Sequence, residues 1–297
     1  MRAVAPQSLF CFGIGFSARA LIDRLDRDTW HIAGTVTTDQ AAMEWRDKGV
    51  EASVFDGSRP APGLREALAV ATHLLVSAPP GPYGDPALLH HGADIAAAPR
   101  LAWIGYLSTI GVYGDRAGTW VDERDEPQPT SGRSRWRRDA EIAWQQLAAA
   151  SGKRCVLFRL AGIYGPGRSA IDNVRSGRAK RIVKPGQKFN RIHVEDIASA
   201  VLASMSGRGT SDVYNLCDDE PSPPQDVIAY AATLLGAPMP PEIPYDDPAL
   251  GEMTRSFFSE SKLVHNDLAK RDLGLQLAYP NYREGLAAIA ASLVRQS

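Results

Sequence analysis

Short apolar runs alternate along the first half of this chain with stretches in which apolar residues recur every three or four positions. Residues 9–12 form the first run, and behind a glycine turn Ala18, Leu21, Ile22 and Leu25 share one face of a helix. Similar runs follow at residues 31–37, 50–55, 73–77 and 101–107. Strands that are apolar throughout are typical of a parallel sheet covered by helices on both faces. The pattern therefore predicts an α/β fold with a doubly wound parallel sheet.

The turn after the first run reads Gly13-Ile14-Gly15-Phe16-Ser17-Ala18, a GxGxxA pattern between a strand and a helix. The first glycine permits a tight turn, the second lets the backbone approach a pyrophosphate, and the small alanine lets helix and strand pack closely. The phosphates would accept hydrogen bonds from unpaired N–H groups at the start of the helix. The residues therefore predict a dinucleotide-binding loop of the Rossmann type, formed by Gly13, Gly15, Phe16, Ser17 and Ala18. A plain strand–helix turn is the alternative.

Five more residues are candidate cofactor contacts because they follow the predicted strands at the carboxyl edge of the sheet, where ligands bind in this architecture. They are Thr37, Asp39, Asp56, Ala78 and Pro79. An acidic residue near the second strand favours a free ribose 2′-hydroxyl and hence NAD, but Asp39 could equally cap the next helix. The cofactor is therefore predicted as NAD or NADP, with the choice left open.

The fifth apolar run ends in Ser108-Thr109 and is followed by Val112-Tyr113-Gly114. With these residues the chain resembles the extended short-chain dehydrogenase/reductases, the superfamily of nucleotide-sugar epimerases and dehydratases. The resemblance continues, in the same order along nearly the whole chain, at residues 159–168, 189–198, 213–216, 272–275 and 279–286. The last two segments resemble an atypical bacterial branch described as nucleoside-diphosphate-sugar epimerase-like.

The resemblance implies catalytic positions at Thr109 and the adjacent Ser108. It also places Tyr164 and Arg168 on a loop beside the substrate. Arg191 precedes a helix start that is similar to a later motif of the family. These three residues are the predicted substrate-binding positions, and they suit an anionic substrate.

The family's acid/base, a Tyr-x-x-x-Lys pair on the helix after the fifth strand, has no counterpart in residues 129–138, which contain no tyrosine. One alignment places Ser131 and Arg135 at the two positions, and another places Arg133 and Arg137 there. Arginine stays protonated at neutral pH, so it binds anions but does not carry protons. The arginines are either a solvated helix face or an anion clamp.

Another tyrosine could replace the missing acid. Tyr113 and Tyr164 both lie in motifs that border the family's active site, although packing is the default role of both.

These features predict a dinucleotide-binding domain over residues 1–168, to which residues 191–217 return, and a smaller C-terminal substrate lobe over residues 169–297. The expected function is that of an NAD(P)-dependent oxidoreductase or epimerase-like enzyme acting on a small polar substrate such as a nucleotide-sugar. The alternatives are a non-catalytic NAD(P)-binding sensor and an enzyme that no longer uses the cofactor.

Composition narrows the class of partner. A net charge of −1 over 297 residues argues against nucleic-acid or membrane-surface binding, and no apolar run reaches the ~18 residues of a membrane span. Residues 1–6 lack the apolar core of a signal peptide, so we expect a cytoplasmic location. The expected oligomeric state is a monomer or homodimer. The isolated cysteines Cys11, Cys155 and Cys217 are expected in the core, and no histidine has metal-ligand spacing.

Overall fold

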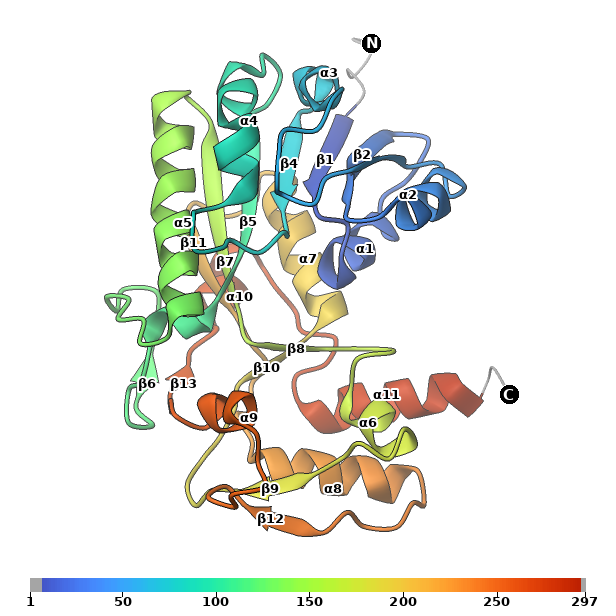
Figure 1. The fold of residues 1–297 in the computed structure, drawn as a ribbon, viewed down its shortest axis with the longest axis vertical. Helices are drawn as coiled ribbons and strands as arrows, with labels where there is room; N and C mark the ends of the chain where they lie inside the picture. The colour runs from blue at the N-terminus through green and yellow to red at the C-terminus, as the bar shows by residue number, and fades with distance from the viewer. Residues whose placement is uncertain (1–6, 295–297) are drawn as a thin grey trace.

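The computed structural model describes residues 7–294. Its core is a sheet of seven strands, all parallel, in the order β11-β7-β5-β4-β1-β2-β3 (Figure 1). In chain order the strands are β1 (Gln7–Phe12), β2 (Trp30–Val36), β3 (Glu51–Val54), β4 (His73–Val76), β5 (Trp103–Thr109), β7 (Arg154–Leu160) and β11 (Val213–Leu216). The predicted doubly wound parallel sheet is confirmed.

Helices cover both faces of the sheet because each strand is apolar on both sides. On β1, Leu9 and Cys11 belong to one apolar cluster, whereas Phe10 and Phe12 belong to the other. The first cluster includes residues of α1, α2, α7 and α10, and the second includes residues of α3, α4 and α5. Their bounds are α1 (Phe16–Ile22), α2 (Asp39–Arg46), α3 (Leu64–Val70), α4 (Pro86–Ala97), α5 (Gly132–Ala150), α7 (Val194–Met205) and α10 (Asp267–Asp272). All three cysteines are buried and free, as expected.

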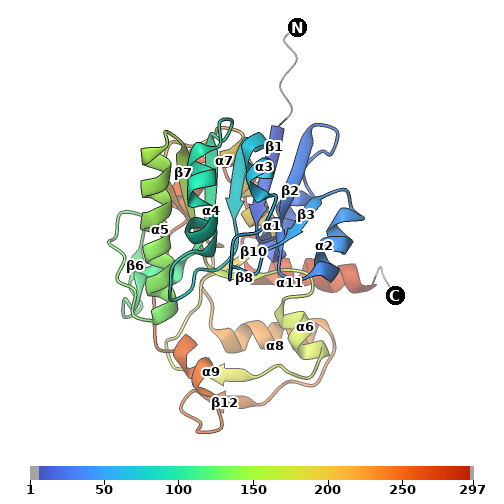
Figure 2. The same cartoon turned by 45° about the horizontal axis from the view of Figure 1, so that its top comes forward.

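A smaller lobe lies below the sheet in Figure 1 and again in Figure 2. The chain enters it through two short parallel strands, β8 (Gly162–Tyr164) and β10 (Arg191–His193). A separate apolar cluster joins its helices α6 (Ala170–Arg175), α8 (Pro224–Leu234) and α11 (Tyr282–Val294). The rest of the lobe is the strand pair β9 (Arg181–Val183) and β12 (Glu242–Pro244), followed by α9 (Glu252–Phe257).

The chain crosses between the two lobes more than once. Within residues 191–217, β10 pairs outside the main sheet, while α7 packs on α1 and β11 forms the sheet edge. A second crossing, absent from the prediction, brings β13 (Leu263–Val264) beside β6 (Trp120–Val121). The segment Met1–Pro6 and residues 295–297, which belong to the predicted domain ends, lie outside the described range.

Side-chain caps mark where two of the helices, α5 and α2, begin. Ser131 caps α5, because its Oγ accepts a hydrogen bond from the amide of Ser134, so the arginine cluster lies inside the helix rather than before it. Thr38, and not Asp39, caps α2 through the amide of Ala41, so of the two roles left open for Asp39 the structure does not support the cap. None of the helices described is both long and apolar enough to cross a membrane.

Candidate functional site

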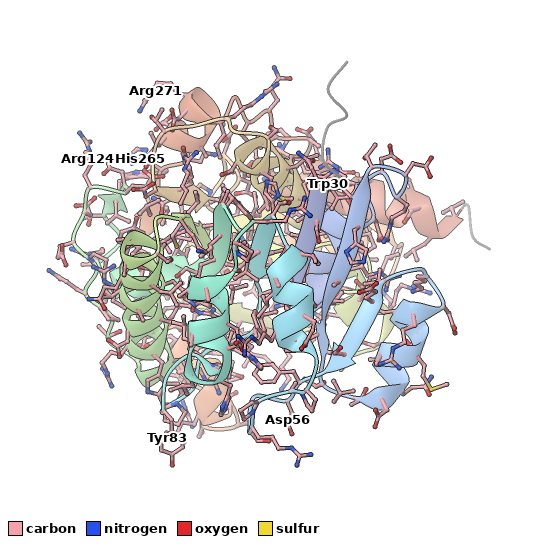
Figure 3. All side chains as sticks on the ribbon, turned by 90° about the horizontal axis from the view of Figure 1, so that it is seen from above. Trp30, Asp56, Tyr83, Arg124, His265 and Arg271 are labelled. Atoms are coloured by element: carbon pink, nitrogen blue, oxygen red, sulfur yellow. The ribbon has the colours of Figure 1, made fainter. Side chains whose placement is uncertain are left out.

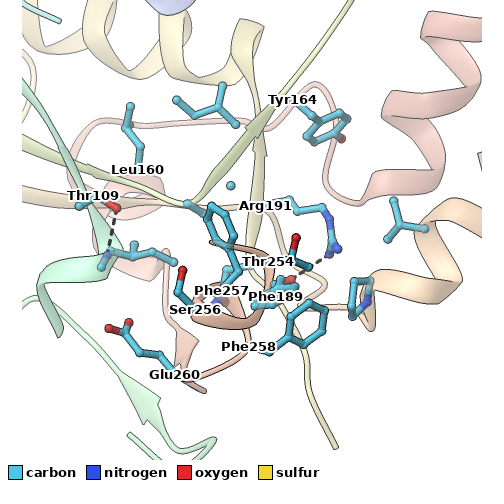
Figure 4. Close-up of a pocket in the computed structure, with 18 of the residues that line it drawn as sticks. Thr109, Leu160, Tyr164, Phe189, Arg191, Thr254, Ser256, Phe257, Phe258 and Glu260 are labelled. Carbon is cyan, nitrogen blue, oxygen red and sulfur yellow. Dashed lines mark hydrogen bonds between the residues drawn. The ribbon is translucent and has the colours of Figure 1, made fainter. Parts of the chain in front are cut away.

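A cavity of about 1600 Å³ opens between the sheet and the smaller lobe (Figure 4). Its sheet side is formed by the end of β5 with the following 3-10 turn η1 (Ile110–Tyr113), by the first turns of α5, and by the connection from β7 to β8. The other side is formed by α6, β10 and the segment 256–262. The cavity therefore lies where the resemblance places a substrate.

Thr109 and Ser108 end β5, but only Thr109 lines the cavity. The Thr109 Oγ1 accepts a hydrogen bond from the amide of Gly111 at 3.0 Å, which leaves its hydroxyl hydrogen free for a ligand. Ser108 points to the opposite side of the strand, where it donates to Glu141 Oε1 at 2.6 Å. Of the two, the structure therefore places Thr109 on the cavity wall and Ser108 in the core.

Behind β5, a buried ion pair holds the end of the sheet to α5. Arg159 on β7 donates to Glu141 through Nε at 3.1 Å and Nη2 at 2.9 Å. Its Nη1 reaches the hydroxyl of Tyr113 at 3.0 Å, and that hydroxyl donates to Asn215 Oδ1 at 2.8 Å. Burial raises the pKa of Tyr113. Tyr113 thus lies within this network and not on the cavity wall.

The ion pair between Arg159 and Glu141 was not predicted from the sequence. A charged residue inside the apolar run of β7, Arg159, was the available indication, because such a residue needs a partner in the core. Its partner Glu141 follows the arginine cluster by a few positions and looks like an ordinary surface residue of a helix.

The first turns of α5 bring two of the arginines to the cavity. Arg133 and Arg137 line it, whereas Arg135 is exposed and donates to the carbonyl of Thr130. Arg137 is fixed by a hydrogen bond from Nη1 to the carbonyl of Leu107 on β5 at 3.0 Å. Both residues of one of the two alignments, Arg133 and Arg137, therefore line the cavity. Ser131, from the other alignment, also lines the cavity.

The three predicted substrate-binding residues all line the cavity. Tyr164 is buried, and its ring lies 5.1 Å from that of His193. Burial raises the pKa of Tyr164 far above the usual range, so this phenol is a poor proton carrier at neutral pH. Arg168 is exposed, and its guanidinium lies 5.6 Å from the ring of Phe16. Arg191 is half-buried and donates from Nη1 to the carbonyl of Phe189 at 2.9 Å (Figure 4).

The glycine loop between β1 and α1 leaves backbone donors available. Gly13 has φ +85° and lies so close to Ala78 that a Cβ would approach the Ala78 amide nitrogen to 3.0 Å. At Gly15 a Cβ would meet only Ser77 Oγ, at 3.8 Å, so the space in front of the loop is open. The amides of residues 16–18 have no hydrogen-bond acceptor within residues 7–294. Free amides beside open space fit the pyrophosphate of a dinucleotide.

The remaining candidate cofactor contacts lie around the same edge of the sheet. Thr37, Asp39 and Pro79 are exposed, and Ala78 packs under the glycine loop. Asp56 lies at the surface (Figure 3), where Ser58 donates to its carboxylate and lowers its pKa. The roles of these residues stay predictions.

Positive charge dominates the cavity wall. Within residues 7–294, eight basic and three acidic side chains line it. The basic side chains are Arg133, Arg137, Arg168, Arg178, Lys180, Lys188, Arg191 and Lys262, and the acidic ones are Asp172, Glu252 and Glu260. Because the chain as a whole has a net charge of −1, this excess is local. A cleft of one sign raises the local concentration of ligands of the opposite charge, so this one attracts anions.

Known proteins resemble this chain over nearly its whole length. A conserved protein of unknown function from Silicibacter pomeroyi has a solved structure with 47% sequence identity and a TM-score of 0.88, over 96% of this chain and 99% of that one. This chain belongs to the same family. No protein-family model matches the sequence. Protein YeeZ of Escherichia coli K12 is 27% identical over 287 residues, which are 91% of this chain and 95% of YeeZ.

The fold of the family is also found in enzymes of known activity. The crystal structure of UDP-glucuronic acid 4-epimerase from Bacillus cereus in complex with NAD matches with a TM-score of 0.75 and 15% identity, over 98% of this chain and 99% of that one. Its fold is that of the extended short-chain dehydrogenase/reductases, so the predicted resemblance is confirmed. Residues 129–138 of this chain contain no tyrosine, in keeping with an atypical member of that fold.

Proposed function

We propose that this protein is an NAD(P)-dependent oxidoreductase or epimerase-like enzyme whose substrate is a small anionic molecule such as a nucleotide-sugar. The observation that carries the proposal is the charge of the cavity wall. Eight basic and only three acidic side chains line the cavity that also contains Thr109. A diphosphate or a carboxylate suits such a wall, because guanidinium groups bind both through paired hydrogen bonds.

The glycine loop is the proposed cofactor site. The amides of residues 16–18 would donate to the pyrophosphate, and Gly15 would let the backbone approach it. The cofactor, when bound, supplies a nicotinamide that takes or gives a hydride. The cation of Arg137, fixed to the carbonyl of Leu107, would take the place of the family's lysine, as one of the two alignments has it, and would remain charged throughout.

The remaining roles belong to residues of the cavity. Thr109 would donate its free hydroxyl hydrogen to the reacting oxygen of the substrate. Arg133, which one of the two alignments places at the family's tyrosine, would hold a negative charge near that oxygen but would not carry its proton. The proton carrier is left unassigned.

A cofactor titration tests the loop. Gly15 has φ −94° and open space around it, so Gly15→Leu leaves the fold intact while its side chain enters the space of the pyrophosphate. We expect NADH and NADPH to bind the wild type and to bind this variant at least about tenfold more weakly, measured by titration calorimetry. An equal affinity in a variant with an unchanged melting temperature would refute cofactor binding at the loop.

Turnover tests the chemistry. With either cofactor and a panel of UDP-sugars, we expect activity that falls in Thr109→Ala and persists in Ser131→Ala, since Ser131 is engaged in capping α5. Activity that is equal in wild type and Thr109→Ala would remove Thr109 from the mechanism.

A non-catalytic NAD(P) sensor is the second candidate function. It is favoured by the absence of tyrosine from residues 129–138 and by the burial of Tyr113 and Tyr164, which raises the pKa of both candidate replacements. The sensor predicts cofactor binding with no turnover on any substrate of the panel, together with a conformational response of the smaller lobe.

A further inference from the structure

Arg191 presents unused hydrogen-bond donors to the cavity. Its Nη1 donates to the carbonyls of Phe189 and Ser222, at 2.9 and 3.1 Å. Its other two guanidinium nitrogens have no acceptor within residues 7–294, although the side chain lines the cavity. A half-buried guanidinium with two free nitrogens is suited to a bidentate contact with an anionic group.

A buried carboxylate, that of Asp218, interacts electrostatically with this arginine. Asp218 follows β11, and its amide donates to the carbonyl of Arg191 at 2.6 Å. Its side chain is 2% exposed, and neither carboxylate oxygen has a hydrogen-bond partner among the residues described. Ionising this buried carboxylate is costly, because it has lost its hydration and the nearby amides of Glu220 and Arg191 compensate for that loss only in part.

The titratable groups near Asp218 and Arg191 come from three elements and from the segment after β11. Arg191 on β10 favours its ionised form, and the neighbouring Asp219 opposes it. Tyr164 on β8 interacts with both Asp218 and Arg191, and Tyr282 on α11 interacts with Arg191. Burial is the largest effect and raises the pKa of Asp218 to about 8. The carboxyl group is therefore mostly neutral below that pH, and Arg191 keeps an uncompensated positive charge.

We propose that Arg191 and Asp218 form a proton-linked subsite, in which Arg191 binds an anionic group of the ligand, a phosphate or a carboxylate, only while Asp218 is protonated. This inference rests on the proposed anionic substrate and adds a subsite with a pH dependence to it. When Asp218 ionises, its charge neutralises Arg191 and repels the ligand, so the anion and a proton bind together.

Anion titrations from pH 7 to 9 test the subsite. Sulfate represents phosphate and malonate represents a carboxylate, and neither titrates in this range, so any pH dependence belongs to the protein. For the anion that fits, we expect affinity to fall about tenfold from pH 7 to 9. With a pKa of about 8, the protonated fraction of Asp218 falls by about that factor over this range. Calorimetry in two buffers of different ionisation enthalpy should show proton uptake at pH 8.5.

Three variants separate the possible results. In Asp218→Asn the affinity should be independent of pH and about tenfold above wild type at pH 9. The exposed neighbour Asp219→Asn should keep the pH dependence, with its midpoint moved to lower pH because a charge that opposes ionisation of Asp218 is gone. Arg191→Gln should lose the pH-dependent part of binding. The proton uptake of the unmodified protein gives a readout even if a variant folds poorly.

The failures are distinguishable. Binding that is independent of pH in the wild type, or equally pH-dependent in Asp218→Asn, would overturn the subsite and leave the anionic cavity in place. If neither sulfate, malonate nor a UDP-sugar binds at pH 7, both the subsite and the proposed substrate class are wrong.

Discussion

The buried ion pair between Arg159 and Glu141 should contribute strongly to holding the end of β5 beside the cavity. The two side chains are 3% and 0% exposed, and Glu141 also accepts from Ser108, which adjoins Thr109. Arg159→Met removes the cation and leaves a charged carboxylate in the core. Breaking a buried pair in this way costs about 3–5 kcal/mol.

A matched variant lies on the same carboxylate. Arg138 contacts the same Oε2 atom of Glu141 at 3.1 Å, but its side chain is 24% exposed. Because water screens that contact, Arg138→Met should cost about 1 kcal/mol or less. The double variant Glu141→Leu/Arg159→Met removes both buried charges and should recover most of the stability lost in Arg159→Met.

Urea unfolding at 25 °C, followed by circular dichroism, measures the three free energies of unfolding. We expect a large loss of unfolding free energy in Arg159→Met, a small loss in Arg138→Met, and recovery of most of the lost stability in the double variant. Equal losses in the two single variants, or a double variant that is less stable than Arg159→Met, would refute the claim that an uncompensated buried charge causes the effect.

Three other outcomes follow from the structure. Burial raises the pKa of Asp196 to about 6 and that of Asp218 to about 8, so both protonate more readily in the folded than in the unfolded chain. Stability should therefore fall as the pH rises from 5 to 8, and Asp218→Asn should remove roughly 2–4 kcal/mol of that fall in urea titrations. Gly114→Ala should unfold at much lower urea than wild type, because φ is +69° and the Cβ would lie 1.9 Å from the carbonyl oxygen of Gln128. Thr38→Ala should cost about 1 kcal/mol through the lost cap of α2, whereas Asp39→Ala should cost little, by thermal melting.

The sequence by itself determined the sheet and the place of the site along the chain. A strand buried on both faces must be apolar throughout, so β1, β2, β4 and β5 were visible as runs of apolar letters. The order of short motifs was enough to predict the family's fold and to show that its acid/base pair is absent. These features are local, and each can be recognised within about ten residues.

Only the tertiary structure decided which side chains meet. Arg133 and Arg137 face the cavity while Arg135 does not, because the residues that α5 buries against the sheet fix the rotation of the helix. The pairing of Arg159 with Glu141 joins a strand to a helix.

The contact between Asp218 and Arg191 likewise joins residues far apart in sequence, because Arg191 lies on β10 and Asp218 follows β11. Such charges look like surface residues until packing removes water from them, since burial and partner are properties of the assembled chain and not of any segment.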